Sequence, residues 1–416
     1  MKQTIFTLFL LLLASVAVQA QNHPTCTATR YLTDSFAVDS AFNVLYGNND
    51  TYAGNNQDLF MDIFSPANDV ATQRPVVLLA FGGSFVGGER ADVHDLCAYY
   101  ASKGYVAVTI DYRIYDGGFI PLPDSNDLVD VVVKAIGDMK AAVRYLRQDA
   151  ATSDLYKIDP NQIFVGGISA GAIVANHVAV LDSTDTIEAF LLTAIQNNGG
   201  WEGNSNSLSY SSEVQGSINF SGALRDANYI DANDPPIFSA HDDNDGTVPY
   251  GNGSARIASI PVLRLQGSQV MHQRMDTLGI NNFLITIPNS NDHVSFFQGN
   301  AAMWRDSVLD TSTEFVHDIL CPTVLPTQFV NNQSTIAVKV YPNPAQHNVT
   351  IDLGVTVANF EVTVFDNLGR IAYQQVVNNQ FATVLPRAAF AKGMYHVRID
   401  FEDQTLPAIA TKVVFD

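Results

Sequence analysis

Charged residues are scarce in this chain, and basic residues are the scarcest of them. Only 15% of the residues are charged, and 22 Lys and Arg stand against 42 Asp and Glu, which gives a net charge of −20 and a pI near 4.6. Nucleic-acid binding depends on clustered basic side chains that neutralise phosphates, and docking on anionic lipid depends on the same charge. The composition therefore argues against a nucleic-acid-binding protein and against a protein held on an anionic membrane surface.

Cysteine is also rare, with three residues, Cys26, Cys97 and Cys321. No C-x-x-C pair and no Cys/His cluster occurs in the sequence, so no zinc site is expected. In an exported chain, three cysteines allow one disulfide and leave one thiol over, and the sequence does not choose among the three pairings. Cys26 and Cys321 sit near the two ends of the main predicted domain, which favours that pair.

Long apolar runs are missing after the N-terminus. Residues 1–20 are typical of a signal peptide, because Lys2 precedes an apolar segment at 5–17 and the sequence Val-Gln-Ala at 18–20 is a small-x-small cleavage site. No later stretch reaches 18 apolar residues, so we expect no stable membrane insertion. These features predict a secreted protein whose mature chain starts at Gln21.

The middle of the chain alternates strand-like and helix-like patterns. Apolar runs at 75–81, 104–110 and 163–166 predict buried strands, and apolar residues at steps of three and four over 128–146 predict an amphipathic helix. Strands that are apolar throughout and are separated by helices indicate a mostly parallel sheet covered on both faces. We therefore predict an α/β domain over residues 21–321.

The composition changes after Cys321. Residues 322–335 are rich in Pro, Thr, Asn and Gln and have no helical period, so they are predicted to be a linker. Residues 336–416 contain runs of alternating apolar and polar residues, which predict a small antiparallel β-sandwich domain. The runs that carry this prediction lie at 337–341, 348–353, 360–365, 394–399 and 411–415.

Residues 167–171 have the sequence Gly-Ile-Ser-Ala-Gly. This G-x-S-x-G pattern follows a predicted strand and opens a predicted helix, the setting that holds a nucleophilic serine on a strained turn at the end of a sheet. A phosphate-binding loop is disfavoured, because neither G-K-[ST] nor G-x-G-x-x-G occurs. Ser169 is therefore the predicted nucleophile, and the alternative is an ordinary serine in a glycine-rich turn.

A serine hydroxyl is a weak nucleophile and needs a base that is itself held by a third group. On an α/β fold of this kind the acid follows the serine in the chain, and the histidine follows the acid. A predicted strand at 236–240 leads into a loop that holds Asp242, Asp243 and Asp245. We favour Asp245, which precedes a glycine and a Val-Pro step, and the other two stay open as alternatives.

His293 is the predicted base, because it follows a predicted strand at 283–288 within a short loop. The remaining histidines after Asp245 fall in helical stretches or in the tail: His272, His317, His347 and His396.

Backbone N–H groups are the expected donors to an oxyanion. One comes from Ala170, the residue after the nucleophile, and others are expected from the loop Phe-Gly-Gly-Ser-Phe at 81–85. We assign the oxyanion hole to Gly83, Ser84 and Ala170, and the alternative for 81–85 is a plain turn between a strand and a helix. Neither a metal nor a cofactor is expected.

Taken together, these motifs resemble the α/β-hydrolase carboxylesterase/lipase family over most of residues 30–320. The resemblance implies that Ser169, Asp245 and His293 form a triad that cleaves a small-molecule or polymer-borne ester through an acyl-enzyme. Two departures stand out: Phe81 occupies a position where many such esterases have histidine, and Asp242 follows His241 where relatives often have glycine. A serine peptidase on the same fold and a catalytically silent secreted binding protein remain alternatives.

The tail resembles the C-terminal sorting domains of the type IX secretion system of Bacteroidetes. The match rests on Tyr-Pro-Asn-Pro-Ala at 341–345, Gly-Met-Tyr at 393–395 and Lys412 in the last run. This resemblance implies that the outer-membrane secretion machinery is a partner and that the protein is extracellular or at the cell surface. A carbohydrate-binding β-sandwich is the alternative, although neither tryptophan of the chain lies in the tail. Residues 197–212, rich in Asn, Gly and Ser, are a candidate lid or a solvated loop.

Overall fold

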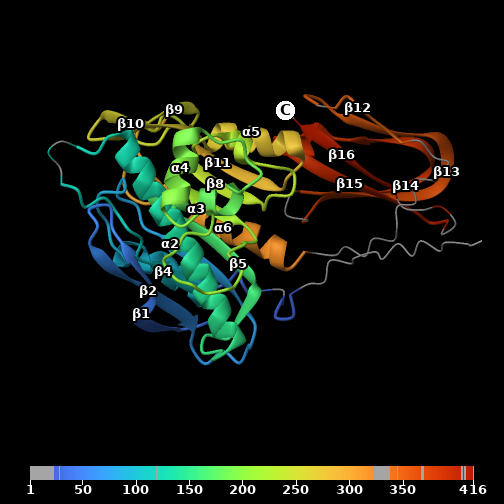
Figure 1. Cartoon of the computed structure of the whole chain (residues 1–416). Helices are drawn as coiled ribbons and strands as arrows, with labels where there is room; N and C mark the ends of the chain where they lie inside the picture. Colours follow the sequence, from blue (N-terminus) through green and yellow to red (C-terminus); the bar gives the residue numbers. More distant parts are fainter. Residues whose placement is uncertain are drawn as a thin grey trace, which may run out of the picture. The chain divides into compact units, whose positions relative to one another are not determined.

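The structure is a computed structural model that describes residues 23–322 and 338–415, apart from residues 28, 119, 121, 344, 367–369, 404, 405, 407 and 408. The chain divides into two compact units, Met1–Thr323 and Val324–Asp416 (Figure 1). The predicted signal peptide (1–20) and all but the first residue of the predicted linker (322–335) lie outside the described residues. Those domain boundaries therefore stay predictions.

The first unit is built on an eight-stranded sheet with the order β1-β2-β4-β3-β5-β6-β8-β11. Every neighbouring pair from β4 to β11 is parallel, and only the β1–β2 and β2–β4 pairs are antiparallel. The prediction of a mostly parallel α/β sheet is confirmed. The strands are β1 (Val38–Asp50), β2 (Asn56–Pro66), β3 (Arg74–Ala80), β4 (Val106–Ile110), β5 (Ile158–Ile168), β6 (Ser217–Phe220), β8 (Ile237–Asp242) and β11 (Asn282–Ile287).

Helices cover both faces of this sheet. They are α1 (His94–Ser102), α2 (Ser125–Ala151), α3 (Ala170–Val180), α4 (Ala189–Asn197), α5 (Ser268–Leu278) and α6 (Arg305–Leu320), with the short 3-10 turns η1 (Arg90–Val93), η2 (Ala227–Tyr229) and η3 (Ala302–Trp304). The long helix α2 contains the predicted helical segment 128–146 and extends beyond it at both ends. Its N-cap is Asp124, whose carboxylate accepts hydrogen bonds from the backbone N–H groups of Asn126 and Asp127.

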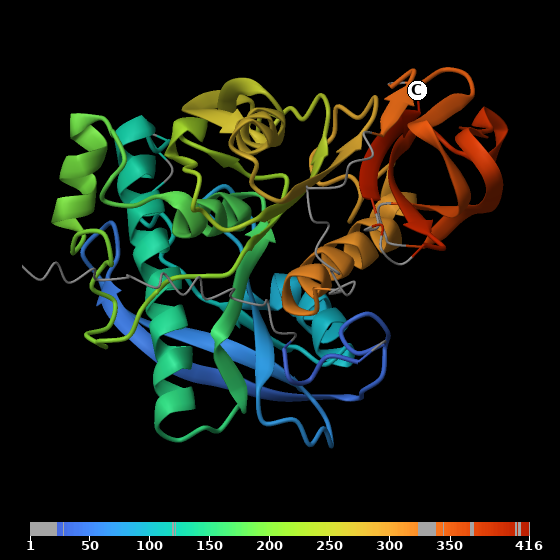
Figure 2. The same cartoon turned by 90° about the vertical axis from the view of Figure 1, so that its right-hand side faces the viewer.

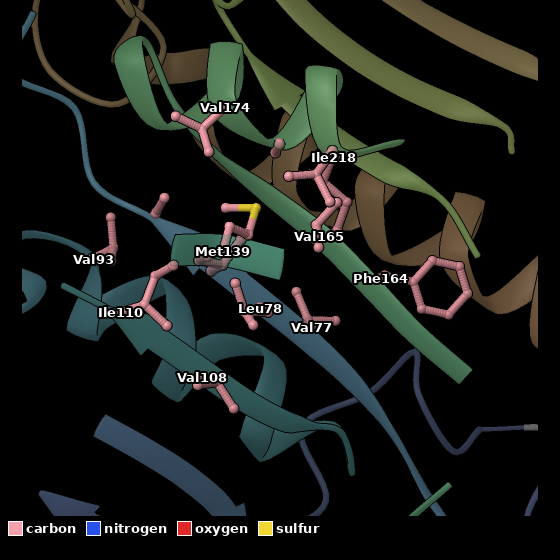
Figure 3. Close-up of a cluster of buried hydrophobic side chains, with 14 of the residues drawn as sticks. Val77, Leu78, Val93, Val108, Ile110, Met139, Phe164, Val165, Val174 and Ile218 are labelled. Carbon is pink, nitrogen blue, oxygen red and sulfur yellow. The ribbon is translucent and has the colours of Figure 1, made fainter. Parts of the chain in front are cut away.

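The alternation of side chains along β8 shows which helix covers which face of the sheet. Phe238 packs against Phe315 of α6, with ring centroids 6.0 Å apart, whereas its neighbour Ser239 bonds to His272 of α5. Because successive residues of a strand point to opposite faces, α5 and α6 cover opposite faces of the sheet. Figure 3 shows part of the apolar core around β3 and β5, where Leu78, Val165 and Met139 of α2 have no solvent exposure.

Between the loop after β8 and helix α5 the chain forms a hairpin, which belongs to a second, three-stranded sheet. It has the order β7-β10-β9 and contains the hairpin of β9 (Asn252–Ile257) and β10 (Ile260–Gly267), with β7 at Ala223–Leu224. The sequence analysis assigned no strand to this region, because a short half-exposed hairpin lacks a continuous apolar run. We call β9 and β10 the flap hairpin from here on.

A disulfide joins Cys26 and Cys321, whose Cα atoms are 5.8 Å apart. This is the pair that the sequence position favoured, and it joins the two ends of the first unit's described chain. Cys97 remains a free thiol, and burial raises its pKa well above the usual value. The thiol is therefore protonated and unreactive, in keeping with a purely structural cysteine.

The second unit is an antiparallel sheet with its own apolar core, as predicted. Its strands are β12 (Lys339–Tyr341), β13 (Val349–Phe365), β14 (Ile371–Leu385), β15 (Gly393–Phe401) and β16 (Ile409–Phe415), with the turn η4 at Arg387–Ala389. Figure 2 shows these orange and red strands curling around an interior.

The tail strands differ from the predicted runs in two respects. The runs at 348–353 and 360–365 belong to one strand, β13, which continues through a register irregularity between Asp352 and Val357. Strand β14 was missed, because the polar residues 378–380 interrupt the apolar alternation on which strand prediction relies.

Candidate active site

Ser169 sits on a sharp turn between β5 and α3. Its backbone φ is 55°, a left-handed conformation that costs free energy for a residue with a side chain. The flanking glycines explain how the turn fits. A Cβ on Gly167 would lie 2.6 Å from the carbonyl oxygen of Ala80, and one on Gly171 would collide with the same oxygen. The turn is therefore wedged against the end of β3, and only glycine fits on either side of the serine.

The three residues predicted as nucleophile, base and acid lie in one hydrogen-bonded line. The Nε2 atom of His293 is 2.7 Å from the Oγ atom of Ser169, and its Nδ1 atom is 2.6 Å from the Oδ2 atom of Asp245. The other carboxylate oxygen of Asp245 accepts the backbone N–H groups of Thr247 and Val248, at 2.7 and 3.0 Å. His293 thus contacts Asp245, 48 positions away in the chain, and Ser169, 124 positions away.

The surroundings of Asp245 keep it ionised. Burial by itself would raise the pKa of the carboxyl, but hydrogen bonds from His241 and His293 outweigh burial and hold the pKa at about 2. A carboxylate with such a low pKa carries its negative charge throughout the physiological range. It can therefore stabilise a positive charge that develops on the imidazole of His293.

His241 is a site residue that the sequence analysis did not assign. Its Nε2 atom is 3.3 Å from Oδ2 of Asp245 and 3.1 Å from the carbonyl oxygen of Val248, and its Nδ1 atom is 2.8 Å from the Oγ atom of Ser268. With two acceptors facing Nε2, that nitrogen carries the proton and donates to both. The signal available in the sequence was the position of His241 near the end of a buried strand, four residues before Asp245.

Asp242 and Asp243, the two alternatives to Asp245, bond to other groups. Asp242 is fully buried and accepts hydrogen bonds from the backbone N–H and the hydroxyl of Ser295. Asp243 accepts the backbone N–H groups of Asn289 and Ser290, at 2.9 and 3.0 Å. Both carboxylates therefore hold the loop that carries His293, and the imidazole itself bonds to Asp245.

The other histidines of the first unit lie elsewhere. The Nδ1 atom of His272 is 2.7 Å from the Oδ1 atom of Asn282, and its Nε2 atom is 2.7 Å from the Oγ atom of Ser239. His317 pairs with its neighbour Asp318 near the end of α6. His347 and His396 belong to the second unit.

The predicted oxyanion loop runs beside Ser169. A Cβ on Gly82 would lie 3.4 Å from the Cβ atom of Ser169, and Ser84 and Ala170 line the same cavity as Ser169. Gly83 and Ser84 have φ values of 120° and 56°. A Cβ on Gly83 would also collide with the carbonyl oxygen of Gly87, so the tight turn of this loop requires glycine there.

Phe81, which replaces the histidine of many similar esterases, is held by Tyr112. The two rings stack with centroids 4.3 Å apart, and the hydroxyl of Tyr112 donates a 2.8 Å hydrogen bond to the carbonyl oxygen of Phe81. Both side chains are buried. Aromatic packing and one buried hydrogen bond thus brace the loop at this position.

Residues 197–212 pack against helix α2. The carbonyl oxygen of Trp201 accepts a hydrogen bond from Lys140, and Glu202 pairs with Arg144. Trp201 lines a different cavity from the one that contains Ser169. These contacts favour a structural loop over a lid.

Two segments of the chain match known protein families. Residues 61–222 match the BD-FAE family, and residues 339–414 match the secretion system C-terminal sorting domain. The first unit has an α/β-hydrolase fold. The sorting domain marks the protein for type IX secretion to the cell surface or the extracellular space, as predicted. Among the described residues, no helix has both the length and the apolar character needed to span a membrane.

Curated relatives of the α/β-hydrolase unit are distant. Acetylcholinesterase of Gallus gallus is 29% identical over 145 residues, which are 34% of this chain and 18% of that protein. Fumonisin B1 esterase of Sphingopyxis macrogoltabida is 33% identical over 141 residues, 33% of this chain and 26% of that protein. The chain thus spans about a fifth to a quarter of the length of these relatives.

Among solved structures, Thermogutta terrifontis esterase 2 phosphorylated by paraoxon has a TM-score of 0.50 and 21% identity, covering 68% of this chain and 95% of that one. At this identity the likeness concerns the fold. It agrees with the mostly parallel sheet of the first unit.

Proposed function

We propose that this protein is a secreted serine hydrolase of carboxylic esters. The observation that carries the proposal is the continuous line from Ser169 through His293 to Asp245, with the serine on a strained turn beside a glycine-rich loop. Two distant relatives are named as enzymes acting on esters, and the structural neighbour is named an esterase. The geometry therefore supports ester hydrolysis, and the names of these relatives agree with it.

In the first half of the reaction, Oγ of Ser169 attacks the ester carbonyl while its proton passes to Nε2 of His293. Asp245 holds the imidazole by Nδ1 and stabilises the imidazolium. The oxygen of the tetrahedral intermediate becomes negative and accepts hydrogen bonds from the backbone N–H groups of Gly83, Ser84 and Ala170. When the bond to the alcohol breaks, His293 returns the proton to that alcohol, and the acyl group stays on Ser169.

In the second half, a water molecule takes the place of the alcohol. His293 removes one proton from this water, which attacks the acyl carbonyl, and then returns that proton to Oγ of Ser169. The products are the free acid and the regenerated enzyme. No step requires a cofactor.

A covalent probe tests the proposal directly. A fluorophosphonate reacts with an activated serine, and we expect one adduct per chain, located on Ser169 by peptide mass spectrometry. The adduct should be absent from the His293→Ala variant, in which the hydroxyl lacks its base. A chain that remains unlabelled would instead support the silent binding protein, and turnover of peptide amides in preference to esters would support the peptidase.

The second unit is proposed to engage the outer-membrane secretion machinery and to take no part in catalysis. The two units have separate apolar cores, and every residue of the proposed triad belongs to the first. A chain that ends at Cys321 should therefore keep its esterase activity but remain inside the cells, as measured by activity in the medium and in the cell fraction. A truncated chain that folds but is inactive would contradict this division of roles.

A further inference from the structure

An apolar cavity lies beside Ser169. Its empty space is about 340 Å³, part of it open to solvent. The oxyanion loop and the start of α3 form one side, with Ser84 and Ala170, and α2 contributes Leu128. The flap hairpin forms the opposite side with Ala255 of β9 and Leu263 of β10. Aliphatic side chains dominate this lining, so the cavity suits a hydrocarbon group.

The cavity lies on the acyl side of the nucleophile. His293 must reach the leaving alcohol to return its proton, so the alcohol has to lie on the side of Ser169 that faces the imidazole. The residues that line the cavity include Ser169 but not His293. The part of the ester that enters the cavity is therefore the acyl chain, with its carbonyl oxygen toward Ser84 and Ala170.

Two side chains, which we call the wall, separate this cavity from a second one. Ile173 of α3 and Leu263 of β10 line it and also line a second apolar cavity, whose empty space of about 450 Å³ is partly open to solvent. The second cavity lies among α2, α3, α4 and β10, and Leu265 belongs to it alone. Ile173 and Leu263 are almost completely buried, with 3% and 7% exposure, and they stand between the two spaces.

From this arrangement we propose that the esterase selects short aliphatic acyl chains and that Ile173 and Leu263 set the upper limit of their length. The inference rests on the proposed function and deepens it by naming the acyl group. Each methylene that enters the first cavity leaves water and strengthens binding, until the chain meets the wall. Longer chains must displace packed side chains, which an interior of ordinary density resists.

The test is a series of p-nitrophenyl esters from acetate to decanoate. For the wild-type full chain, kcat/KM should rise by up to about 4-fold per methylene at the short end of the series. It should then fall from butyrate to octanoate. A wild-type profile that keeps rising to decanoate would overturn the proposal.

Leu263→Ala opens the wall, and Leu265→Ala is its matched control. The two residues lie on the same face of β10, are both buried, and lose the same atoms, but only Leu263 separates the cavities. We expect the ratio of octanoate to butyrate hydrolysis to rise by about 10-fold in Leu263→Ala and to stay at the wild-type value in Leu265→Ala. An equal shift in both variants, or no shift in either, would contradict the role of the wall.

Ala255→Leu tests the same cavity in the opposite direction. Ala255 pairs directly with Leu263 across the flap hairpin, so three added carbon atoms would occupy the acyl space. Butyrate hydrolysis should fall relative to acetate hydrolysis, and an unchanged ratio would overturn the proposal even if Leu263→Ala failed to fold. If the wild-type chain hydrolysed no ester at all, the proposed function itself would be wrong, which is a different outcome from an ester hydrolase with no length limit.

Discussion

Replacing Ser169 with alanine should reduce ester hydrolysis by about 10⁶-fold in kcat, close to the limit of detection. The reason is chemical: Oγ of Ser169 is the atom proposed to form the acyl bond, and Nε2 of His293 lies 2.7 Å from it. The remaining activity would come from the oxyanion hole and from binding alone. The measurement is turnover of p-nitrophenyl butyrate by purified full-length protein.

Ser221 provides the matched control for this variant. It too has a left-handed backbone, with a φ of 55°, and is fully buried. Its hydroxyl has no hydrogen-bond partner among the described residues, so removal of that oxygen leaves no group unpaired. Ser221→Ala should keep wild-type activity and thermal stability. Retained activity in Ser169→Ala, or an equal loss in Ser221→Ala, would remove Ser169 from the mechanism.

Replacing Asp245 with asparagine should lower kcat by about 10⁴-fold. The amide keeps the shape of the side chain but carries no charge, and it can present its NH₂ group to Nδ1 of His293 and so favour the wrong tautomer. The pKa of Asp245 is lowered from 3.8 to about 2, so the wild-type carboxylate is ionised at every pH from about 5 to 9. Titration of Asp245 itself therefore contributes no pH dependence to the wild-type rate over that range.

Asp242→Asn and Asp243→Asn separate support of the loop from catalysis. Asp243 is half-buried and accepts two backbone N–H groups, which an amide oxygen can still accept in part, so Asp243→Asn should cost little activity. Asp242 is fully buried against Ser295, and Asp242→Asn should mainly lower the melting temperature. A 10⁴-fold loss at either position, with Asp245→Asn still active, would move the role of the acid to that residue.

The sequence was sufficient for features that depend on neighbouring residues. The buried strands β3, β4 and β5 could be predicted because a fully covered parallel strand must be apolar along its length. The turn at Ser169 could be predicted because its strand, glycines and helix are contiguous in the chain. The flap hairpin and β14 could not, since their residues are partly exposed and lack the continuous apolar run or regular alternation on which strand prediction relies.

The candidate site also has features that follow from the sequence and features that do not. The order of Ser169, Asp245 and His293 along the chain, and the position of each after a predicted strand, follow from the sequence. Three aspartates within four residues, however, differ only in the direction in which the loop points them. His241 was missed for the same reason: its contacts with Asp245, Val248 and Ser268 depend on how the loop after β8 turns back over the strand.

The sequence by itself determined the α/β class of the first unit, the β class of the tail and the strand-turn-helix position of the proposed nucleophile, because short-range patterns of burial and glycine carry that information. The tertiary structure alone decided which carboxylate meets His293, that His241 also holds this carboxylate, and which side chains line the cavity beside Ser169. These facts depend on the approach of side chains from β8, β10 and α3, which are far apart in the chain. Close packing fixes such contacts to within an ångström, and no local pattern of residues encodes them.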